Sequence, residues 1–288
     1  MMFSNRGLRL RRATRLSRAT LAAALAAAAL LAAPSPAAAG IGDLLVAPTR
    51  LVLDGRRGTE IILNNIGDAT ATYRISVEFR RMTPDGRLID VTEPSAEEKL
   101  AQDMIVYAPR RVTLAPNQPQ SVRIAARAPQ GLADGEYRIH LLFRAIPPAR
   151  PVIAPADQPP ATGLRFALTP IYGVTIPVIV RLGNLSAQAG IANVHLASLE
   201  GKPAVALDLS RSGDRSTFGE VRVLKPGVKA PIAIQKAVAI YKEVATRRVT
   251  IPVDEAFKGS VGGPVTVQYV ETFDDGTNVI AETSAVLR

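Results

Sequence analysis

The sequence predicts an all-β protein that contains two β-sandwiches. Short runs in which apolar and polar residues alternate follow one another between residues 44 and 146, separated by turn residues. A second set of such runs begins after Gly183 and continues through residue 288. The chain holds 22 prolines and no Trp, which is typical of a strand-and-turn protein. Roughly seven short strands in about 105 residues favour an immunoglobulin-like sandwich for each half.

Runs of period two define the strands of the first half. In "TYRISVEFR", "SVRIAAR" and "EYRIHLLFR" every second residue is apolar, as in strands with one buried face. The single helical signal is "SAEEKLAQDM", in which Ser95 and Glu98 have the spacing of a capping box. Turns are predicted at Asp54-Gly55, Asn65 to Asp68, Pro84-Asp85-Gly86, Pro116-Asn117 and Asp134-Gly135.

The second half has the same pattern with different residues. The runs are "AVALDLS", "GEVRVL", "APIAIQ", "RRVTIPV", "PVTVQYVETF" and "SAVLR". The stretch "AGIANV" before His195 is interpreted as a turn, and "GSVGG" at 259–263 as a β-turn. These runs predict a second sandwich over residues 183–288.

Residues 1–39 have the order of a secretory signal peptide. Six arginines and no acidic residue precede an Ala/Leu run, and the small residues Ala37 to Ala39 follow it. The alternative is a membrane anchor, but the apolar run falls short of the roughly twenty residues that a span needs. We therefore expect cleavage near Gly40 and no stable membrane insertion of the mature chain.

Charge and composition exclude several classes of function. The chain has 35 basic and 25 acidic residues, hence a net charge of +10, and removal of six signal-peptide arginines leaves 29 − 25 = +4. So small an excess, spread along the chain, indicates no nucleic-acid partner. Because the chain has no Cys, neither disulfides nor thiol chemistry can contribute, and core packing must hold the fold.

The residues give no indication of an enzyme. The two histidines, His140 and His195, are expected at the surface or rim, and they lack the spacing of a zinc site. "GSVGG" lacks the lysine of a phosphate-binding loop, and Asp274-Asp275 precedes Gly276 as in a hairpin turn. We expect no catalytic residues, no metal and no cofactor.

One predicted strand is unusually long. "GLRFALTPIYGVTIPVIVR", residues 163–181, alternates almost throughout, although strands usually run about five or six residues. It contains Pro170 and Pro177, which an internal strand does not accommodate. A proline-rich stretch, residues 145–163, precedes it and is interpreted as a mobile loop. These features predict an edge strand longer than its own sheet requires.

Three stretches of the first half resemble one family. "VAPTRLVLDG" has an arginine, Arg50, before an apolar pair and a turn. "RVTLAPNQPQSVRI" has a proline turn before a strand with a central arginine, and "GEYRIHLLFRAIPP" ends in an R-x-I-P-P corner. In order and spacing, residues 44–181 resemble the PapD-like periplasmic chaperones of pilus and fimbrial assembly.

The resemblance implies a function for the long strand. Chaperones of this family lend such a strand to pilin subunits whose immunoglobulin-like fold lacks one, in donor-strand complementation. The implied location is the periplasm, and the implied partners are pilin or fimbrial subunits, with an outer-membrane usher as a further candidate. The implied donor residues are Leu164, Phe166, Leu168, Tyr172 and Val174.

The resemblance also implies two charged sites. In the family, an arginine on the first strand and a lysine on the long strand hold the subunit's C-terminal carboxylate; Arg50 matches the arginine, but Pro177 occupies the lysine position. Arg181, or alternatively Arg138, would then have to replace the lysine. Glu136 and Arg181 match members of an ion pair between the domains, which the signal peptide and the two sets of alternating runs place at 40–182 and 183–288.

The main alternative is a secreted two-domain β-sandwich that binds a ligand or builds an envelope structure without chaperone activity. The alternation over 164–180 would then cover the protein's own core. An unliganded chaperone strand, in contrast, should be partly exposed and protease-sensitive near residues 150–163.

Overall fold

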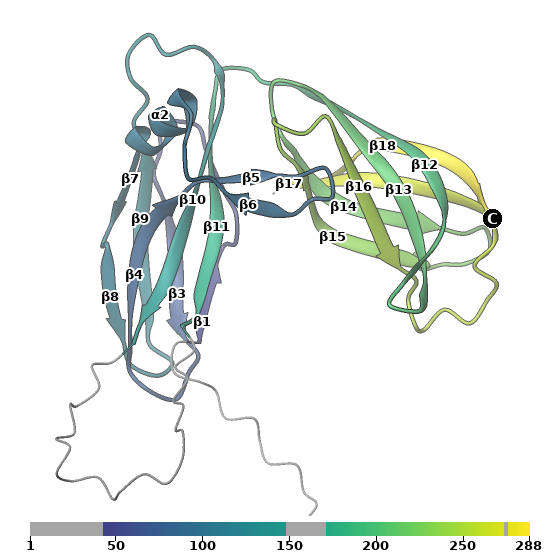
Figure 1. The fold of residues 1–288 in the computed structure, drawn as a ribbon, viewed down its shortest axis with the longest axis horizontal. Helices are drawn as coiled ribbons and strands as arrows, with labels where there is room; N and C mark the ends of the chain where they lie inside the picture. Colours follow the sequence, from purple (N-terminus) through teal and green to yellow (C-terminus); the bar gives the residue numbers. More distant parts are fainter. Residues whose placement is uncertain (1–42, 148–170, 274–275) are drawn as a thin grey trace, which may run out of the picture. The chain divides into compact units, whose positions relative to one another are not determined.

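Strands arranged in two sandwiches form almost all of the secondary structure in this computed structural model, which describes residues 43–147, 171–273 and 276–288 (Figure 1). The predicted all-β fold is confirmed. The first sandwich consists of a four-stranded sheet in the order β1-β3-β9-β7 (sheet A) and a five-stranded sheet in the order β2-β11-β10-β4-β8 (sheet B). Its strands are β1 (Leu44–Ala47), β2 (Leu51–Leu53), β3 (Thr59–Asn65), β4 (Ala71–Glu78), β7 (Ile105–Ala108), β8 (Arg111–Leu114), β9 (Pro119–Ala126), β10 (Gly135–Ile146) and β11 (Gly173–Leu182).

Alternation along these strands builds the first core. In β10, Ile139, Leu141 and Phe143 are fully buried between the two sheets, while the residues between them face the outer side of sheet B. Helix α2 (Ala96–Met104) begins with the predicted capping box, in which Ser95 accepts from the Glu98 N–H and Glu98 reaches back to Ser95. The helix adds Ala101 and Met104 to this core.

The first segment of the described chain belongs to both sheets. β1 pairs with β3 in sheet A, and after Pro48 the chain crosses to sheet B, where β2 runs parallel to β11. The parallel register joins Leu51 to Val178 and Leu53 to Val180. This crossing places Arg50, which directly precedes β2, on sheet B.

β11 is the described part of the predicted strand 163–181. It pairs with β10 over its whole length, but β2 covers only Val178–Val180 of its other side. Among the described residues, no strand pairs with that other side over Gly173–Pro177, so β11 is an edge strand there and an internal strand beyond. Pro177 lies at the change, a position that tolerates the missing N–H. Leu164, Phe166, Leu168 and Pro170 lie outside the described residues.

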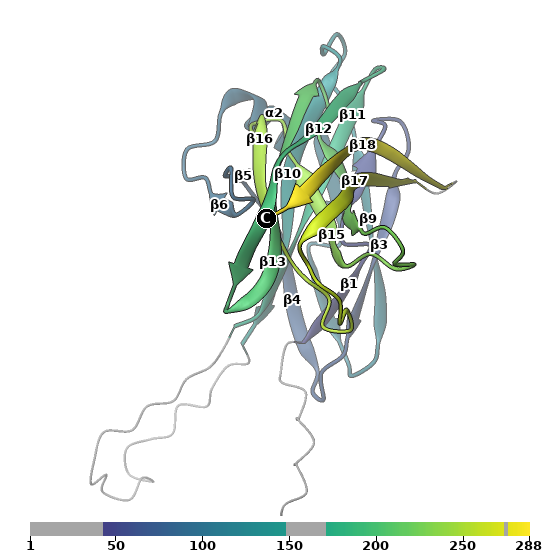
Figure 2. The same ribbon diagram turned by 90° about the vertical axis from the view of Figure 1, so that its right-hand side faces the viewer.

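The second sandwich consists of a three-stranded sheet in the order β12-β13-β16 and a four-stranded sheet in the order β15-β14-β17-β18 (Figure 2). Each predicted run of this half overlaps one of its strands, although "APIAIQ" begins three residues before β15. The strands of this sandwich are β12 (Ala187–Leu199), β13 (Lys202–Gly213), β14 (Thr217–Leu224), β15 (Ala233–Ile240), β16 (Thr246–Pro252), β17 (Gly263–Phe273) and β18 (Gly276–Leu287).

The interpretation of "AGIANV" as a turn was wrong. These residues belong to β12, whose pairing with β13 shifts between Ala192 and His195. Asn193 adopts a φ of 53° within the irregularity, a conformation that Asn tolerates better than most residues. A β-bulge therefore produced the turn-like composition.

A small hairpin joins the two sandwiches. β5 (Arg80–Met82) and β6 (Leu88–Asp90) form a separate two-stranded sheet, closed by the predicted turn at 84–86 (Figure 1). Met82 is buried in the core of the second sandwich, as is Ile179 from the outer face of β11. The Pro84 carbonyl accepts from the Arg248 N–H at 2.7 Å. Residues from the first half thus complete the second core.

Candidate functional site

The predicted anchor residue Arg50 lies in a row of side chains that crosses sheet B. The registers Leu51–Val178 and His140–Pro177 place Arg50, Pro177 and His140 at one level on three adjacent strands. All three are on the outer face, because their neighbours along the strands, such as Leu51 and Ile139, belong to the first core. Two rings of the second sandwich, Phe218 and Tyr241, contact this row.

Arg50 is a cation without an acidic partner in the described chain. Its guanidinium carbon lies 4.5 Å from the centre of the Phe218 ring, and Nη1 is buried without a hydrogen bond. Burial lowers the pKa of Arg50, and the nearby charge of Arg181 lowers it further. A buried guanidinium with an unpaired N–H favours the binding of an anion. A charge-assisted hydrogen bond to the anion would replace the hydrogen bond to water that burial removed.

His140 was expected at the surface, and this expectation was wrong. Its exposed fraction is 1%, and both ring nitrogens are buried without a hydrogen bond. The ring packs edge-on against Tyr241, with centroids 6.4 Å apart. Burial lowers the pKa of His140 to about 3, and the positive charges of Arg138 and Arg80 act in the same direction. The ring is therefore neutral near pH 7 and lies beside the proline that replaces the expected lysine.

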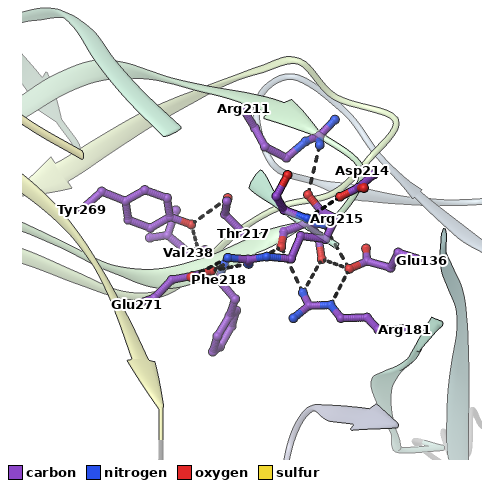
Figure 3. Close-up of polar contacts among 12 residues, drawn as sticks. Glu136, Arg181, Arg211, Asp214, Arg215, Thr217, Phe218, Val238, Tyr269 and Glu271 are labelled. Carbon is purple, nitrogen blue, oxygen red and sulfur yellow. Dashed lines mark hydrogen bonds and ion pairs between the residues drawn. The ribbon is translucent and has the colours of Figure 1, made fainter. Parts of the chain in front are cut away.

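Arg181, the first candidate to replace that lysine, is already paired. Its Nε donates to Glu136 Oε2 at 2.9 Å, and its Nη2 donates to the Ser216 carbonyl at 3.0 Å (Figure 3). Glu136 is 2% exposed and also accepts from the Ser216 N–H and hydroxyl. Figure 3 shows this junction next to the Arg215–Glu271 pair.

Arg138, the second candidate, is paired as well. Its guanidinium donates two hydrogen bonds to Glu243, at 2.6 and 3.2 Å, and lies 3.7 Å above the centre of the Tyr241 ring. Burial raises the pKa of Glu243, but the hydrogen bond and charge of Arg138 and the Met82 N–H outweigh it, so this pKa lies below its ordinary value. Arg181 and Arg138 thus link the two sandwiches through hydrogen bonds, whereas Nη1 of Arg50 has no hydrogen-bond acceptor.

The sequence interpretation missed the partners from the second sandwich. Ser216, Phe218, Tyr241 and Glu243 meet residues more than 40 positions away in the chain, and no local motif signals such contacts. One signal was present: Ile179, like Ile171 and Pro177, is an exception on the otherwise polar parity of 163–181, and it proves to be buried in the second core.

The described donor-strand candidates lie at an open end of the first sandwich. Tyr172 is 50% exposed, and its carbonyl accepts from the Ala145 N–H, so pairing with the strand β10 continues to this residue. Val174 packs against the first core. Tyr172 and Val174 line a recess that also includes Leu44 and the half-exposed Ile66. The apolar face of β11 therefore extends to Tyr172, one residue before the strand begins.

Within residues 43–147, 171–273 and 276–288, no three His, Asp or Glu side chains gather in a way that could hold a metal ion. In the same ranges, no helix has the length and apolar character needed to cross a membrane.

Comparisons with known proteins found solved structures of one class. No protein-family model matches the chain, and no curated protein matches it. The CupB2 chaperone of Pseudomonas aeruginosa is 16% identical, with 85% of this chain and 100% of that chain covered and a TM-score of 0.44. The SafB chaperone of Salmonella enterica was solved in complex with the SafA pilin. It is 17% identical, with 87% of this chain and 99% of that chain covered and a TM-score of 0.44. The Escherichia coli chaperone DraB is 16% identical, with 86% of this chain and 98% of that chain covered and a TM-score of 0.43. Each of these three proteins is a chaperone, and SafB was solved with a pilin.

Proposed function

We propose that this protein is a periplasmic chaperone that binds and caps pilin-like subunits by donating a strand to them for pilus assembly. The observation that carries the proposal is the unpaired edge of β11 over Gly173–Pro177, which continues the alternating residues 163–172 and ends beside Arg50. An exposed edge of this kind presents unpaired N–H and C=O groups to another chain.

The edge suits β-augmentation, the mode in which chaperone–pilin complexes form. Backbone hydrogen bonds along Gly173–Pro177 supply pairing without sequence specificity. Alternate side chains supply selectivity, and Leu164, Phe166, Leu168 and Tyr172 share the parity that faces the core in β11. Each such side chain is worth roughly 1.5–3 kcal/mol when it is fully buried in a client groove.

Arg50 would hold a carboxylate at the inner end of this edge. Its buried Nη1 lacks a partner, and a charge-assisted hydrogen bond there is worth about 1.5–3 kcal/mol. Because Arg181 is engaged by Glu136, we assign it a positioning role and give the anchor to Arg50. The donor strand therefore contributes most of the affinity, and Arg50 fixes its register.

The remaining parts of the proposal concern organisation. Residues 1–39 act as a cleaved signal peptide, 40–182 form the domain with the donor strand, and 183–288 form the second domain. The expected partners are pilin or fimbrial subunits, with an outer-membrane usher receiving the complex. The activity is binding, with no catalytic step.

The test is recovery of the client from cells. The chain is expressed with residues 1–39, the mature protein is purified from periplasm, and bound polypeptides are identified by mass spectrometry. A pilin-like subunit is expected with the native chain and should be lost when Leu164, Phe166 and Leu168 are changed to Ser. Recovery of the native chain without any such polypeptide, from cells that produce pilin subunits, would contradict the proposal.

One observation favours the alternative of a secreted two-domain protein without chaperone activity. Ile176, Val178 and Val180 cover the protein's own core, as that alternative requires for the whole strand. Under it, the Leu164, Phe166 and Leu168 to Ser variant should unfold at a lower temperature than the native chain. Under the chaperone proposal, its melting temperature should be unchanged while client binding is lost.

A further inference from the structure

Three arginines form a row across the outer face of sheet B, away from the contacts with the second sandwich. Arg111 of β8 is directly opposite Arg74 of β4, and Arg74 is directly opposite Arg144 of β10. All three side chains are exposed, and their neighbours Tyr73 and Phe143 face the first core. We call these three residues the arginine row.

The arginine row is unfavourable for the isolated protein. Adjacent strands lie about 4.8 Å apart, and like charges directly opposite one another destabilise a sheet. None of the ion pairs among the described residues includes Arg74, Arg111 or Arg144. The nearest acidic residue along β4 on this face is Glu78, which pairs with Arg80 at 3.0 Å. The repulsion in the row is thus not offset within the described chain.

The row lies close to the proposed binding edge. Arg144 is directly opposite Gly173, the first residue of the unpaired stretch of β11. The row also shares the face of sheet B from which Arg138 and His140 contact the second sandwich. A polypeptide added to β11 would therefore lie two strands from Arg144, and the row would lead away from it across β4 to β8.

We propose that the arginine row is a docking surface for an acidic segment of the bound client polypeptide, an inference that rests on the proposed function. Guanidinium groups bind carboxylates in a bidentate manner, and an acidic segment that crosses sheet B from β10 to β8 would pass over all three arginines. Complementary charge of this kind accelerates association and gives it a strong salt dependence. An acidic polypeptide is favoured over a lipid surface because the row adjoins a backbone edge that pairs with polypeptide.

The test compares two variants that each remove three charges. In the row variant, Arg74, Arg111 and Arg144 become Gln; in the control variant, the exposed Lys99, Lys229 and Lys236 become Gln. The probes are the client recovered from periplasm, a fluorescent Glu-rich peptide, and phosphatidylglycerol vesicles. We expect the row variant to bind client and peptide roughly tenfold more weakly at low salt, with a flatter salt dependence. The control variant should remain within about twofold of the native protein.

The outcomes separate this inference from the proposed function. Equal client and peptide binding by both variants overturns the inference and leaves the proposed function standing. Loss of vesicle binding alone in the row variant also overturns it, in favour of a lipid surface. Failure of the native protein to bind any pilin-like client overturns the proposed function first. Folding is monitored by thermal melts, in which the row variant should melt higher than the native chain at low salt, because repulsion is removed.

Discussion

Glu136 accepts two hydrogen bonds from Ser216, one from its N–H at 3.0 Å and one from its hydroxyl at 2.9 Å. Glu136 belongs to β10 of the first sandwich, whereas Ser216 directly precedes β14 of the second. Arg181 completes the group by donating to the same carboxylate oxygen at 2.9 Å. One buried oxygen of Glu136 thus accepts three hydrogen bonds from two other segments of the chain.

Replacing Glu136 by Ala should destabilise the protein by roughly 2–4 kcal/mol. The change leaves Arg181 without its carboxylate and the buried Ser216 N–H without an acceptor, and breaking a buried pair from one side is costly. Urea unfolding measures the loss. The control is Glu255→Ala, since Glu255 pairs with Lys202 at the exposed surface, where little loss of stability is expected. Equal effects of the two changes would contradict a structural role for Glu136.

His140 should make the protein sensitive to acid. Its pKa is about 3 in the folded protein, below the ordinary 6.5, so the neutral ring contributes stability above pH 6.5 that is lost as the pH falls toward 3. In that window the contribution falls by about 1.4 kcal/mol per pH unit. His140→Phe should remove this dependence and leave stability at pH 7 equal or higher, because the two unsatisfied nitrogens disappear.

The measurement is urea unfolding of the native chain and the variant between pH 6.5 and 4. The exposed His195, changed to Phe, is the matched control and should leave the pH dependence as it is in the native chain. Parallel curves for the native chain and His140→Phe would show that the histidine is not kept neutral by burial.

Arg50→Ala should weaken client binding by about tenfold or more while leaving the fold intact. The client loses a charge-assisted hydrogen bond worth about 1.5–3 kcal/mol. The substitution removes the cation–π contact with the Phe218 ring, which contributes about 0.5–2 kcal/mol to the stability of the fold. It also removes a buried N–H that has no hydrogen-bond partner, and this gain in stability offsets the loss. Calorimetric titration with the recovered client checks the affinity. The control is Arg123→Ala, because Arg123 forms an exposed ion pair with Glu60. If Arg50→Ala binds the client with unchanged affinity, the carboxylate anchor has been lost along with the lysine.

Tyr172 and Ile171 offer a test of parity within two adjacent residues. Their exposed fractions are 50% and 46%, so neither substitution by Ser should change stability greatly. Only Tyr172 shares the parity of the proposed donor residues. We therefore expect Tyr172→Ser to reduce client affinity about tenfold, since it removes one buried aromatic side chain, and Ile171→Ser to have little effect. Equal losses in a client pull-down would argue against insertion of one face of the strand into a groove.

Alternation predicted the strands well because it records a local property, namely which side of a strand meets the core. It predicted the faces of β4, β9 and β10, and the capping box predicted the start of α2. It failed for β12, where a bulge at Asn193 interrupts the period. It could not foresee the hairpin β5–β6, because "TYRISVEFR" gives no sign that the chain leaves its sheet near Phe79.

The candidate site was predictable only in part, since its partners come from distant segments. Arg50 was identified by resemblance, but its contact with Phe218 and its unpaired nitrogen depend on the second sandwich. His140 was misplaced for the same reason: its strand parity is polar, yet Tyr241 covers that face. Exceptions to alternation deserve more weight in chains with two cores: Ile179, on the polar side of its strand, is buried in the second core, although Ile171 on the same side is 46% exposed.

The burial of Met82 and Ile179 in the second core limits how far the two sandwiches can act as interchangeable modules. A chain cut after residue 182 would leave the second half without two of its core side chains, and large-to-small losses of this kind cost about 2–5 kcal/mol each. A hybrid that joins the first sandwich of this protein to the second sandwich of another would meet a surface shaped for different residues. Recombination between such proteins should therefore succeed only when the hairpin β5–β6, the strand β11 and the second sandwich are inherited together.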